Sequence, residues 1–191
     1  MSDLRKQKSD LRKQVLNQRQ QLDSKAWQEK SEKITEKVRQ LNEFRNANAV
    51  HCYVSMNDRN EVATDSLIDD VLKSGRQLIV PVTNFEDGTL THSLLPAKDI
   101  LKKNEWGVKE PAKINEFDIS KLDIILIPMA AADIKGNRLG YGKGFYDRFL
   151  KESSAFKVGM IFHEFLFDEI PTESFDEKLD AIITDREVIF P

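Results

Sequence analysis

The amino-acid sequence predicts an α/β fold: a single domain, residues 1–191, with a mainly parallel sheet flanked by helices and with N-terminal helices packed over it. Two observations carry this prediction. After residue 48, short apolar runs alternate with stretches of helical periodicity, which is the pattern of parallel strands joined by helices. The first 45 residues contain neither Gly nor Pro and repeat their apolar residues at helical spacing. A chain of 191 residues can bury one core, and no linker or internal repeat divides it.

The composition argues against two classes of partner, nucleic acids and membranes. A net charge of −3 argues against a nucleic-acid surface, which would be basic. The single cysteine, Cys52, cannot form an internal disulfide, which suits a reducing compartment. No apolar run approaches the ~20 residues of a membrane span, and the polar N-terminus lacks the apolar core of a secretory signal. We therefore expect a cytoplasmic protein without nucleic acid or membrane among its partners. We also expect a monomer, although no feature of the sequence determines the oligomeric state.

Two amphipathic helices are expected in the N-terminal region. Apolar residues recur at helical intervals over residues 4–22 and again over residues 27–41. Asp23 lies between the two patterns, next to Ser24, and is a suitable N-cap for the second helix. The plain interpretation of the basic residues in the first pattern is a solvated helix face; these residues are Lys8, Arg12, Lys13 and Arg19.

Strands and helices then alternate along the chain. The expected strands are six apolar runs: residues 49–54, 77–82, 123–128, 157–162, 179–184 and 187–190. Asp87-Gly88 predicts a hairpin turn leading into residues 89–95. A helix is expected after residues 61–64, and Gly75 ends it where a left-handed residue is common.

A glycine-rich stretch, Gly136–Leu150, is the most informative part of the sequence. Four of the eight glycines of the chain fall in it: Gly136, Gly140, Gly142 and Gly144. The stretch follows the apolar run 123–128 and leads into Phe145–Leu150, which has the apolar spacing of a helix. A strand, a glycine loop and a helix start form an anion cradle. Glycine lets the backbone approach a phosphate closely, and the first free N–H groups of the helix point at it.

Charged residues favour this cradle over a plain strand-to-helix turn, which stays the alternative. Arg138 and Lys143 would gain nothing in a purely structural turn, but they would hold phosphate charge. Asp147, one turn into the helix, could hold a magnesium ion on the phosphates. The spacing is neither a Walker A loop nor Gly-x-Gly-x-x-Gly, so the residues alone predict a nucleotide or another phosphorylated ligand.

Two acidic residues also follow buried strands, at the edge where ligands gather in a parallel sheet. Glu61 comes after the strand at 49–54, and Asp133 comes after the strand at 123–128. A Glu at a helix start is also a common cap or dipole partner, which is the alternative for Glu61. No zinc-binding spacing and no Ser-His-Asp or Cys-His arrangement stands out.

The segment from Arg138 to Asp147, Arg-Leu-Gly-Tyr-Gly-Lys-Gly-Phe-Tyr-Asp, closely resembles the nucleotide-loop signature of the 5-formyltetrahydrofolate cyclo-ligases, also called methenyltetrahydrofolate synthetases. Three further segments resemble this family: Lys8-Ser-Asp-Leu-Arg12, the Glu-Val-x-Thr context of Glu61, and the loop 104–111 around Trp106. The resemblance implies ATP- and Mg²⁺-dependent ring closure of 5-formyltetrahydrofolate to 5,10-methenyltetrahydrofolate, with release of ADP and phosphate.

The resemblance also implies three sets of site residues. The ATP-binding set is Lys8, Ser9, Asp10, Leu11, Arg12, Arg138, Leu139, Gly140, Tyr141, Gly142, Lys143, Gly144, Phe145 and Tyr146. Lys143 and Arg138 would be its catalytic members. The substrate-binding set is Val54, Met56, Glu61, Trp106, Tyr141 and Phe145. Either Val54 or Met56 would supply the apolar wall. The metal ligands would be Asp147 and Asp180, with a capping role for Asp180 and a core role for Trp106 as alternatives.

Four positions depart from the family pattern: Met129, Ala132, Phe165 and Phe175. The first two could reshape the floor of the pocket, and the last two remove polar contacts from the C-terminal segment. Rival functions are a non-catalytic nucleotide- or anion-binding module, or a sugar-phosphate isomerase or CoA-transferase on a similar sheet. Glu61 and Trp106 discriminate between them, because a pterin needs a hydrogen-bond acceptor and a flat wall whereas a bare phosphate needs neither.

Overall fold

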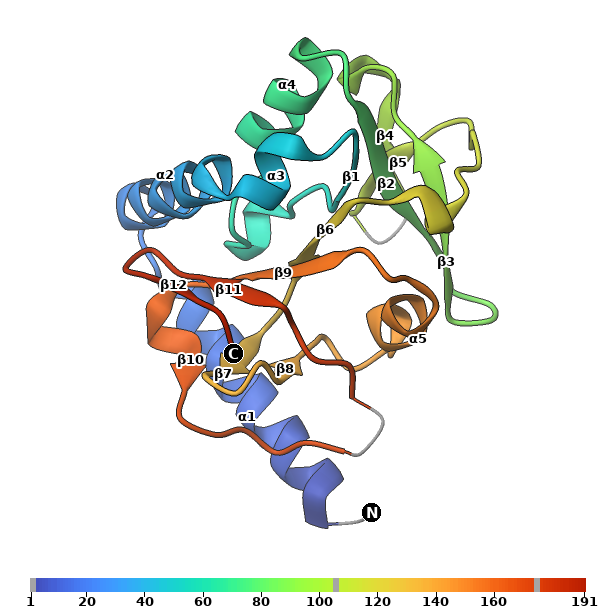
Figure 1. The fold of residues 1–191 in the computed structure, drawn as a ribbon. Coiled ribbons are helices and arrows are strands. Elements are labelled where there is room, and N and C mark those ends of the chain that lie inside the picture. The colour runs from blue at the N-terminus through green and yellow to red at the C-terminus, as the bar shows by residue number, and fades with distance from the viewer. Residues whose placement is uncertain (1–2, 105–106, 174–175) are drawn as a thin grey trace.

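A computed structural model describes residues 3–104, 107–173 and 176–191 of the chain. At its centre lies a seven-stranded sheet with the strand order β12-β11-β9-β6-β1-β2-β3 (Figure 1). The five inner strands run parallel, and β3 and β12 pair antiparallel at the two edges. The strand bounds are β1 Ala49–Cys52, β2 Gln77–Asn84, β3 Thr89–Leu94, β6 Ile124–Pro128, β9 Phe156–Met160, β11 Ala181–Ile183 and β12 Val188–Ile189. The predicted α/β fold with a mainly parallel sheet is confirmed.

The middle of the sheet is its most apolar part. All five residues of β6 and all four residues of β1 are buried. A parallel sheet is covered on both faces, so its strands consist of continuous apolar runs rather than alternating ones. This is why apolar runs alone predicted both strands. The observed β1 ends at Cys52, two residues before the predicted end, where the chain turns toward the polar loop.

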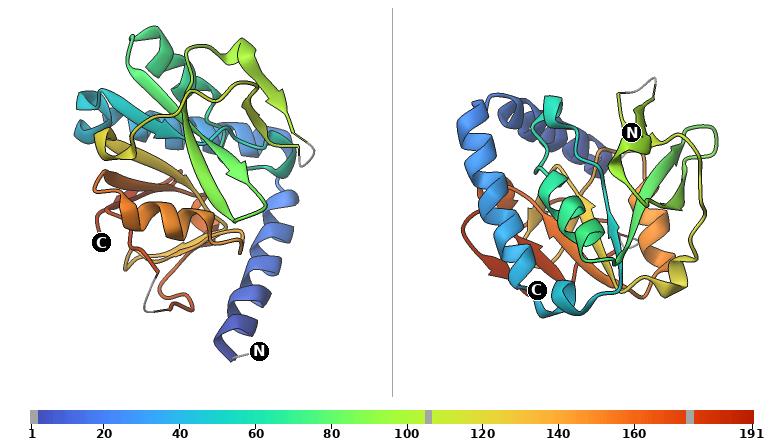
Figure 2. Two further views of the ribbon diagram at one scale, coloured as in Figure 1. Left: turned by 90° about the vertical axis from the view of Figure 1, so that its right-hand side faces the viewer. Right: turned by 90° about the horizontal axis from the view of Figure 1, so that it is seen from above.

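Helices cover both faces of the sheet. α2 (Ser24–Gln40) and α4 (Asp65–Lys73) pack together on one face, and α5 (Phe145–Glu152) lies on the other (Figure 2). Right-handed crossovers explain this arrangement, because β1–α4–β2 and β6–α5–β9 move in opposite directions across the sheet. The other helical elements are α1 Asp3–Gln20, α3 Asn42–Asn46 and the 3₁₀ turns Asn57–Arg59, Lys98–Ile100, Ile119–Lys121 and His163–Phe165.

Local signals for helix ends are confirmed. Asp23 is the N-cap of α2, and its Oδ1 accepts hydrogen bonds from the N–H groups of Lys25 and Ala26, each at 3.0 Å. Gly75 follows α4 with φ +73°, and its N–H donates to Leu72 O at 3.2 Å. Caps of this kind are set by residues close in sequence, so they can be predicted without knowledge of the tertiary structure.

A small hairpin, which the sequence analysis did not identify, lies between β6 and the glycine loop. β7 (Ala131–Asp133) and β8 (Arg138–Leu139) pair antiparallel, and β10 (Leu166–Phe167) joins β7. Gly136 belongs to the turn of this hairpin, with φ +86°. The anion cradle is therefore limited to the later glycines. A second small hairpin consists of β4 Leu101–Lys103 and β5 Lys109–Pro111.

Asp133 is a structural carboxylate of the β7–β8 hairpin. It is fully buried, at 0% exposure. Its carboxylate accepts hydrogen bonds from the N–H groups of Lys135 and Asn137, each at 3.0 Å, and of Ile170 at 3.2 Å. These bonds fix the hairpin turn and tie it to the segment after β10. Its position after β6 therefore serves the fold.

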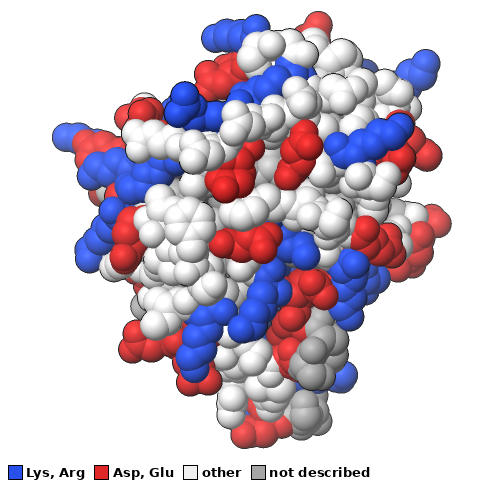
Figure 3. All heavy atoms as spheres, viewed as in Figure 1, with Lys and Arg blue, Asp and Glu red and all other residues white. Residues whose placement is uncertain are grey.

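The surface carries charges of both signs. On the face in Figure 3, Lys and Arg side chains are interspersed with Asp and Glu side chains. This mixture agrees with a small net charge of −3. Among the described residues, no helix has the length and apolar character needed to cross a membrane.

Candidate active site

The glycine loop, residues 140–144, leads from β8 into the N-terminus of α5. Gly142 and Gly144 have φ of +90° and +71°, a conformation that favours glycine. α5 begins at Phe145, as predicted, and no side chain among those described caps its N-terminus. Lys143 is exposed between the two left-handed glycines. The backbone N–H groups of the helix start and the lysine ammonium are therefore available to an anion.

Arg12 of α1 lies across this loop. Its Nε donates to Gly140 O at 2.7 Å, and a Cβ placed on Gly142 would lie 3.0 Å from its Cζ. Burial lowers the pKa of Arg12 from its usual value, while the nearby Asp147 carboxylate opposes this shift. The structure thus places Arg12 beside the glycine loop, although the two segments are far apart in the sequence.

Arg138 and Asp147 form an ion pair beside the loop. Arg138 Nη2 donates to Asp147 Oδ1. The Arg138 side chain is 2% exposed and the Asp147 side chain is 34% exposed. Within the described part of the chain, Arg138 Nε has no hydrogen-bond partner. The Asp147 carboxylate therefore balances a deeply buried cation while one of its sides stays open to solvent.

Lys8, one helical turn before Arg12, contacts the C-terminal part of the chain. Its Nζ donates to Glu173 Oε2 at 2.9 Å and to Asp176 Oδ2 at 2.6 Å. Lys8 and Arg12 share a helix face, as expected for residues four apart. However, the ammonium of Lys8 is paired with two carboxylates and not with the glycine loop. The residues between them, Ser9, Asp10 and Leu11, belong to the same turn of α1.

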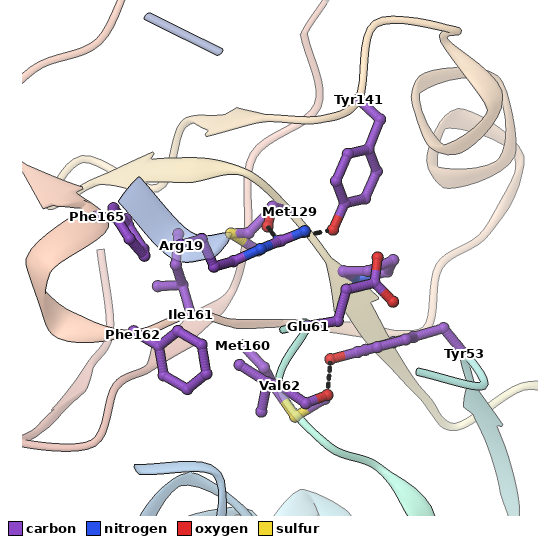
Figure 4. Close-up of a pocket in the computed structure, with 11 residues that line it drawn as sticks. Arg19, Tyr53, Glu61, Val62, Met129, Tyr141, Met160, Ile161, Phe162 and Phe165 are labelled. Carbon is purple, nitrogen blue, oxygen red and sulfur yellow. Dashed lines mark hydrogen bonds between the residues drawn. The ribbon is translucent and has the colours of Figure 1, made fainter. Parts of the chain in front are cut away.

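A second cluster of polar side chains surrounds Glu61, in a small buried pocket (Figure 4). Glu61 is 3% exposed, and its Oε2 accepts a hydrogen bond from the N–H of Met56 at 2.8 Å. The free space in the pocket is about 10 Å³, on the order of the room that one water molecule needs. Its walls include Arg19, Tyr53, Val62, Met129, Tyr141, Met160, Phe162 and Phe165.

Burial raises the pKa of Glu61 above its ordinary value. The N–H of Met56, the phenol of Tyr141 and two nearby guanidinium groups oppose this rise. The alternative role of Glu61 as a helix cap is wrong, because α4 begins only at Asp65 and its N-cap is Thr64. Glu61 is a buried acceptor in a pocket instead.

Arg19, near the end of α1, is buried, so the interpretation of a solvated residue is wrong for it. The residue is 5% exposed. Its Nη1 donates to Tyr141 Oη at 2.9 Å and to Met129 O at 3.3 Å, and its Nε donates to Arg59 O at 3.1 Å. The helical spacing indicates burial at this position, because Arg19 lies four residues after Val15, which is buried on the same face.

Three tyrosines place buried phenol groups near the same pocket. Tyr53 Oη donates to Val62 O at 2.9 Å, whereas Tyr146 Oη is buried without a partner among the described residues. Burial raises the pKa of Tyr53, Tyr141 and Tyr146. The phenols therefore remain neutral donors near neutral pH. Nothing in the sequence indicated that Tyr53 belongs to the site, because a tyrosine after a buried strand is common in any core.

Comparisons with known proteins show the family of the chain. The model of the 5-formyltetrahydrofolate cyclo-ligase family matches residues 4–185. The chain belongs to this family. It is 33% identical over 177 residues to a probable 5-formyltetrahydrofolate cyclo-ligase of Schizosaccharomyces pombe, covering 84% of this chain and 86% of that protein. It is 30% identical over 163 residues to the 5-formyltetrahydrofolate cyclo-ligase of Mus musculus, covering 78% and 79%.

A solved structure extends the similarity to the fold. The NMR structure of Aquifex aeolicus 5,10-methenyltetrahydrofolate synthetase matches with a TM-score of 0.85 and 31% identity, covering 96% of this chain and 92% of that chain. The family resemblance inferred from the glycine loop is therefore confirmed. This member of the cyclo-ligase family is an enzyme of the ligase class, in folate metabolism.

In this cyclo-ligase family member, Asp180 lies apart from the glycine loop. It precedes β11 at the amino ends of the parallel strands, where its carboxylate accepts a hydrogen bond from the N–H of Lys157 at 2.7 Å. At the opposite, carboxyl ends of the strands, Arg148 of α5 links the glycine loop to the β2–β3 turn. Its Nη2 donates to Lys143 O at 3.1 Å and its Nε donates to Gly88 O at 2.9 Å. No three His, Cys, Asp or Glu side chains of the described chain gather as a metal site. These contacts favour the capping role of Asp180.

The other residues expected to bind substrate are less closely grouped. Val54 and Met56 are half-buried, and neither lines the pocket around the buried carboxylate. Phe145 lies at the start of α5, with its ring edge-to-face against Phe85 at a centroid distance of 5.9 Å. Trp106 lies outside the described residues. The assignment of the apolar wall to Val54 or Met56 therefore stays a prediction.

Two of the four departures from the family pattern line the pocket. Met129 lies at its floor, and a Cβ on Gly159 would approach Met129 Cε to 2.2 Å, so the methionine occupies the space above the glycine. Phe165 is 1% exposed and also lines the pocket. Ala132 is buried in β7 and does not line it. Phe175 lies outside the described residues.

The Arg138–Asp147 ion pair predicts that removing Asp147 alone destabilises the protein more than removing both partners. Asp147→Asn leaves a cation with a 2% exposed side chain unpaired, so we expect a loss of about 3 kcal/mol in the free energy of unfolding. Adding Arg138→Met should recover part of this loss, with a coupling energy of about 1 kcal/mol or more. Denaturant unfolding of the two single variants and the double variant measures the cycle. Additive losses would show that the pair contributes nothing to stability.

Proposed function

We propose that this enzyme is a cytoplasmic, monomeric ligase that closes 5-formyltetrahydrofolate to 5,10-methenyltetrahydrofolate in an ATP- and Mg²⁺-dependent reaction. The observation that carries the proposal is the link between two sites. Tyr141 belongs to the glycine loop, and its phenol reaches the buried surroundings of Glu61. One loop thus joins an anion cradle to a buried acceptor. The names of the relatives agree with the 5-formyltetrahydrofolate substrate and the 5,10-methenyltetrahydrofolate product.

The chemistry requires an amide oxygen to become a leaving group. The formyl oxygen attacks the γ-phosphoryl group of ATP and ADP departs. The neighbouring nitrogen of the folate then closes on the activated carbon. This nitrogen loses its proton, and the C–O bond breaks to release phosphate. No step needs a nucleophile from the protein. Its task is to position two substrates and to offset the negative charge that moves during transfer.

The glycine loop supplies the groups for the nucleotide. Lys143 is exposed between two left-handed glycines, so its ammonium can reach a terminal phosphate without displacing packed side chains. Arg12 adds a second cation above Gly140. Arg138 acts from behind the loop, because its buried guanidinium is held by Asp147. In this proposal Lys143 is the catalytic cation, and Arg138 holds the loop and its charge in place.

The donor set fits one magnesium ion at Asp147. Mg²⁺ in nucleotide sites is held by one or two carboxylates together with phosphate oxygens and water, so a single half-exposed carboxylate is sufficient. When bound, the ion would neutralise charge on the transferred phosphoryl group. Asp180 is not included in this site, because its carboxylate caps β9 at the other edge of the sheet.

Glu61 is the proposed acceptor for the pterin. A carboxylate can accept hydrogen bonds from a ring N–H and an exocyclic amine together, which a pterin presents side by side. The pocket of about 10 Å³ holds no more than about one water, so the side chains over Glu61 must move when folate binds. Tyr141 is one of these side chains, and it lies on the loop that meets the nucleotide. A bare phosphate-binding module would have no use for this buried carboxylate.

Turnover should require both ATP and Mg²⁺. The test is absorbance of the methenyl product during incubation with 5-formyltetrahydrofolate, ATP and Mg²⁺. We expect the chromophore only in the complete mixture, and we expect a chelator to abolish it. Activity that survives the chelator or the omission of nucleotide would contradict the proposal. ATP binding with neither phosphate release nor the chromophore would instead support a non-catalytic nucleotide-binding module.

Lys143→Ala should separate catalysis from folding. Loss of a preorganised cation at the transferred phosphoryl group lowers kcat by about 10²-fold or more. The free energy of unfolding should change by no more than about 0.5 kcal/mol, because the side chain is exposed. Lys143→Arg should rescue poorly, since a planar fork does not replace a compact ammonium. Steady-state kinetics and thermal melts check this, with the exposed Lys113→Ala as the matched control. An unchanged kcat would remove Lys143 from the mechanism.

Glu61→Gln should weaken folate binding far more than ATP binding. Loss of a charge-assisted hydrogen bond is worth about 1.5–3 kcal/mol, or one to two decades in affinity. The charged form binds, so affinity should fall as the pH falls through the Glu61 pKa. Because burial raises this pKa, the fall should begin above the value of an ordinary glutamate, about 4.3. Calorimetry across pH measures both effects. Intact folate affinity in the variant would make Glu61 a structural residue.

A further inference from the structure

We infer that Arg19 is a positioning residue that couples the nucleotide loop to the folate acceptor. It holds Tyr141 of the glycine loop and the segment before Glu61 in one arrangement. The inference rests on the proposed roles of the glycine loop and of Glu61. It adds a residue that touches neither the phosphates nor the pterin, and it makes occupation of one site affect affinity at the other.

Arg19 joins three segments of the chain through one side chain. Its Nη1 donates to Tyr141 Oη at 2.9 Å and to the carbonyl oxygen of Met129 at 3.3 Å (Figure 4). Its Nε donates to Arg59 O at 3.1 Å, in the turn that precedes Glu61. At 5% exposure the guanidinium has no ready exchange with bulk water. These three acceptors therefore have to stay where they are to satisfy it.

The first helix holds two consecutive residues of the glycine loop. Arg12 Nε donates to Gly140 O at 2.7 Å, and Arg19 Nη1 donates to Tyr141 Oη at 2.9 Å. Seven residues separate the two arginines, so they lie on the same face of α1, two turns apart. A ligand that shifts the glycine loop therefore acts on both arginines through one rigid helix.

The backbone of Arg19 is also bound to the turn that leads to Glu61. Asn60 Nδ2 donates to the backbone oxygens of Arg19 and Leu22, each at 3.1 Å. Asn60 has φ +49°, a left-handed conformation that few residues other than glycine adopt. This turn runs from Met56, whose N–H holds the Glu61 carboxylate, to Glu61 itself. The end of α1 and the turn around the acceptor are therefore bound together at several points.

Charge also connects Arg19 to the acceptor. The guanidinium favours the ionised form of Glu61 and so opposes the effect of burial on its pKa. The groups that oppose the rise are the Met56 N–H, the Tyr141 phenol and the two guanidinium groups of Arg19 and Arg59. The phenols of Tyr53 and Tyr146 also lie close enough to interact electrostatically with the carboxylate. Movement of Tyr141 would change which of these groups Arg19 contacts. If Arg19 had a purely structural role, neither this electrostatic effect nor the link between the two sites would affect ligand binding.

The test measures coupling directly. Folate affinity is determined by calorimetry with and without a non-hydrolysable ATP analogue. In the unaltered enzyme the analogue should change folate affinity by about fivefold or more, the lower end of usual coupling between sites. Arg19→Met should bring this factor close to one. Tyr141→Phe, which removes only the hydroxyl, should do the same. Arg39→Met is the matched control, because Arg39 pairs with Asp70 between α2 and α4, away from both sites.

A pH profile provides a readout that a structural role would not move. Arg19→Met should shift the acid fall of folate affinity to higher pH, because a stabilising positive charge near Glu61 is lost. Arg19→Lys keeps the charge, so it should restore the position of this fall but not the coupling, since one ammonium cannot replace three directed hydrogen bonds. In the Glu61→Gln background the acid fall should be absent, and Arg19→Met should shift nothing further.

The outcomes separate the inference from the proposed function. An analogue without effect on folate affinity in the unaltered enzyme would overturn the inference. So would full coupling in folded Arg19→Lys and Tyr141→Phe variants, which keeps the test valid if Arg19→Met does not fold. A lower melting temperature with unchanged coupling and pH profile would also overturn it, by showing only a structural role. If Glu61→Gln leaves folate affinity intact, only the proposed role of Glu61 fails. If the complete mixture of 5-formyltetrahydrofolate, ATP and Mg²⁺ gives no methenyl chromophore, the proposed function itself fails.

Discussion

The buried guanidinium of Arg19 is the constraint on which the geometry of the site depends. A charge removed from water must find acceptors within the protein, or the folded state loses several kcal/mol. The acceptors of Arg19 come from the glycine loop, from the end of β6 and from the turn before Glu61. These segments are distant in sequence, so α1 can satisfy its arginine only when all of them have reached their native places. The helix that first looks like a solvated cover thus organises the site.

The β7–β8 hairpin determines how the sheet presents its glycine loop. In a simple strand–loop–helix unit the loop would lie directly at the carboxyl end of β6. Here the hairpin, fixed by the Asp133 carboxylate, carries the chain away and returns it through Arg138. The glycine loop consequently lies against α1, where Arg12 can bind Gly140 O. The same route places Arg138 beside Asp147, so that a deeply buried cation and a half-exposed carboxylate meet next to the cradle.

The sequence predicts most of the fold because its main elements obey local rules. The apolar runs of β1 and β6, the cap at Asp23 and the loop entering α5 at Phe145 each follow from neighbouring residues. The β7–β8 hairpin was missed, since strands of two or three residues have no periodicity to detect. The partners of Lys8 and the remote position of Asp180 were missed for another reason. Both depend on contacts between segments more than 20 residues apart, and no local pattern encodes them.

Burial of Glu61 works against stability near neutral pH. Because its pKa is raised in the folded protein, the folded state binds a proton more tightly than the unfolded chain does. Its favourable contribution is present below the unfolded pKa, about 4.3, and is lost as the pH rises through the raised folded value. A glutamine could accept the same hydrogen bond from Met56 without this loss, so the fold alone does not explain an ionisable group here. The proposed ligand that donates to the carboxylate would explain it, because its hydrogen bonds would replace the water that burial removed.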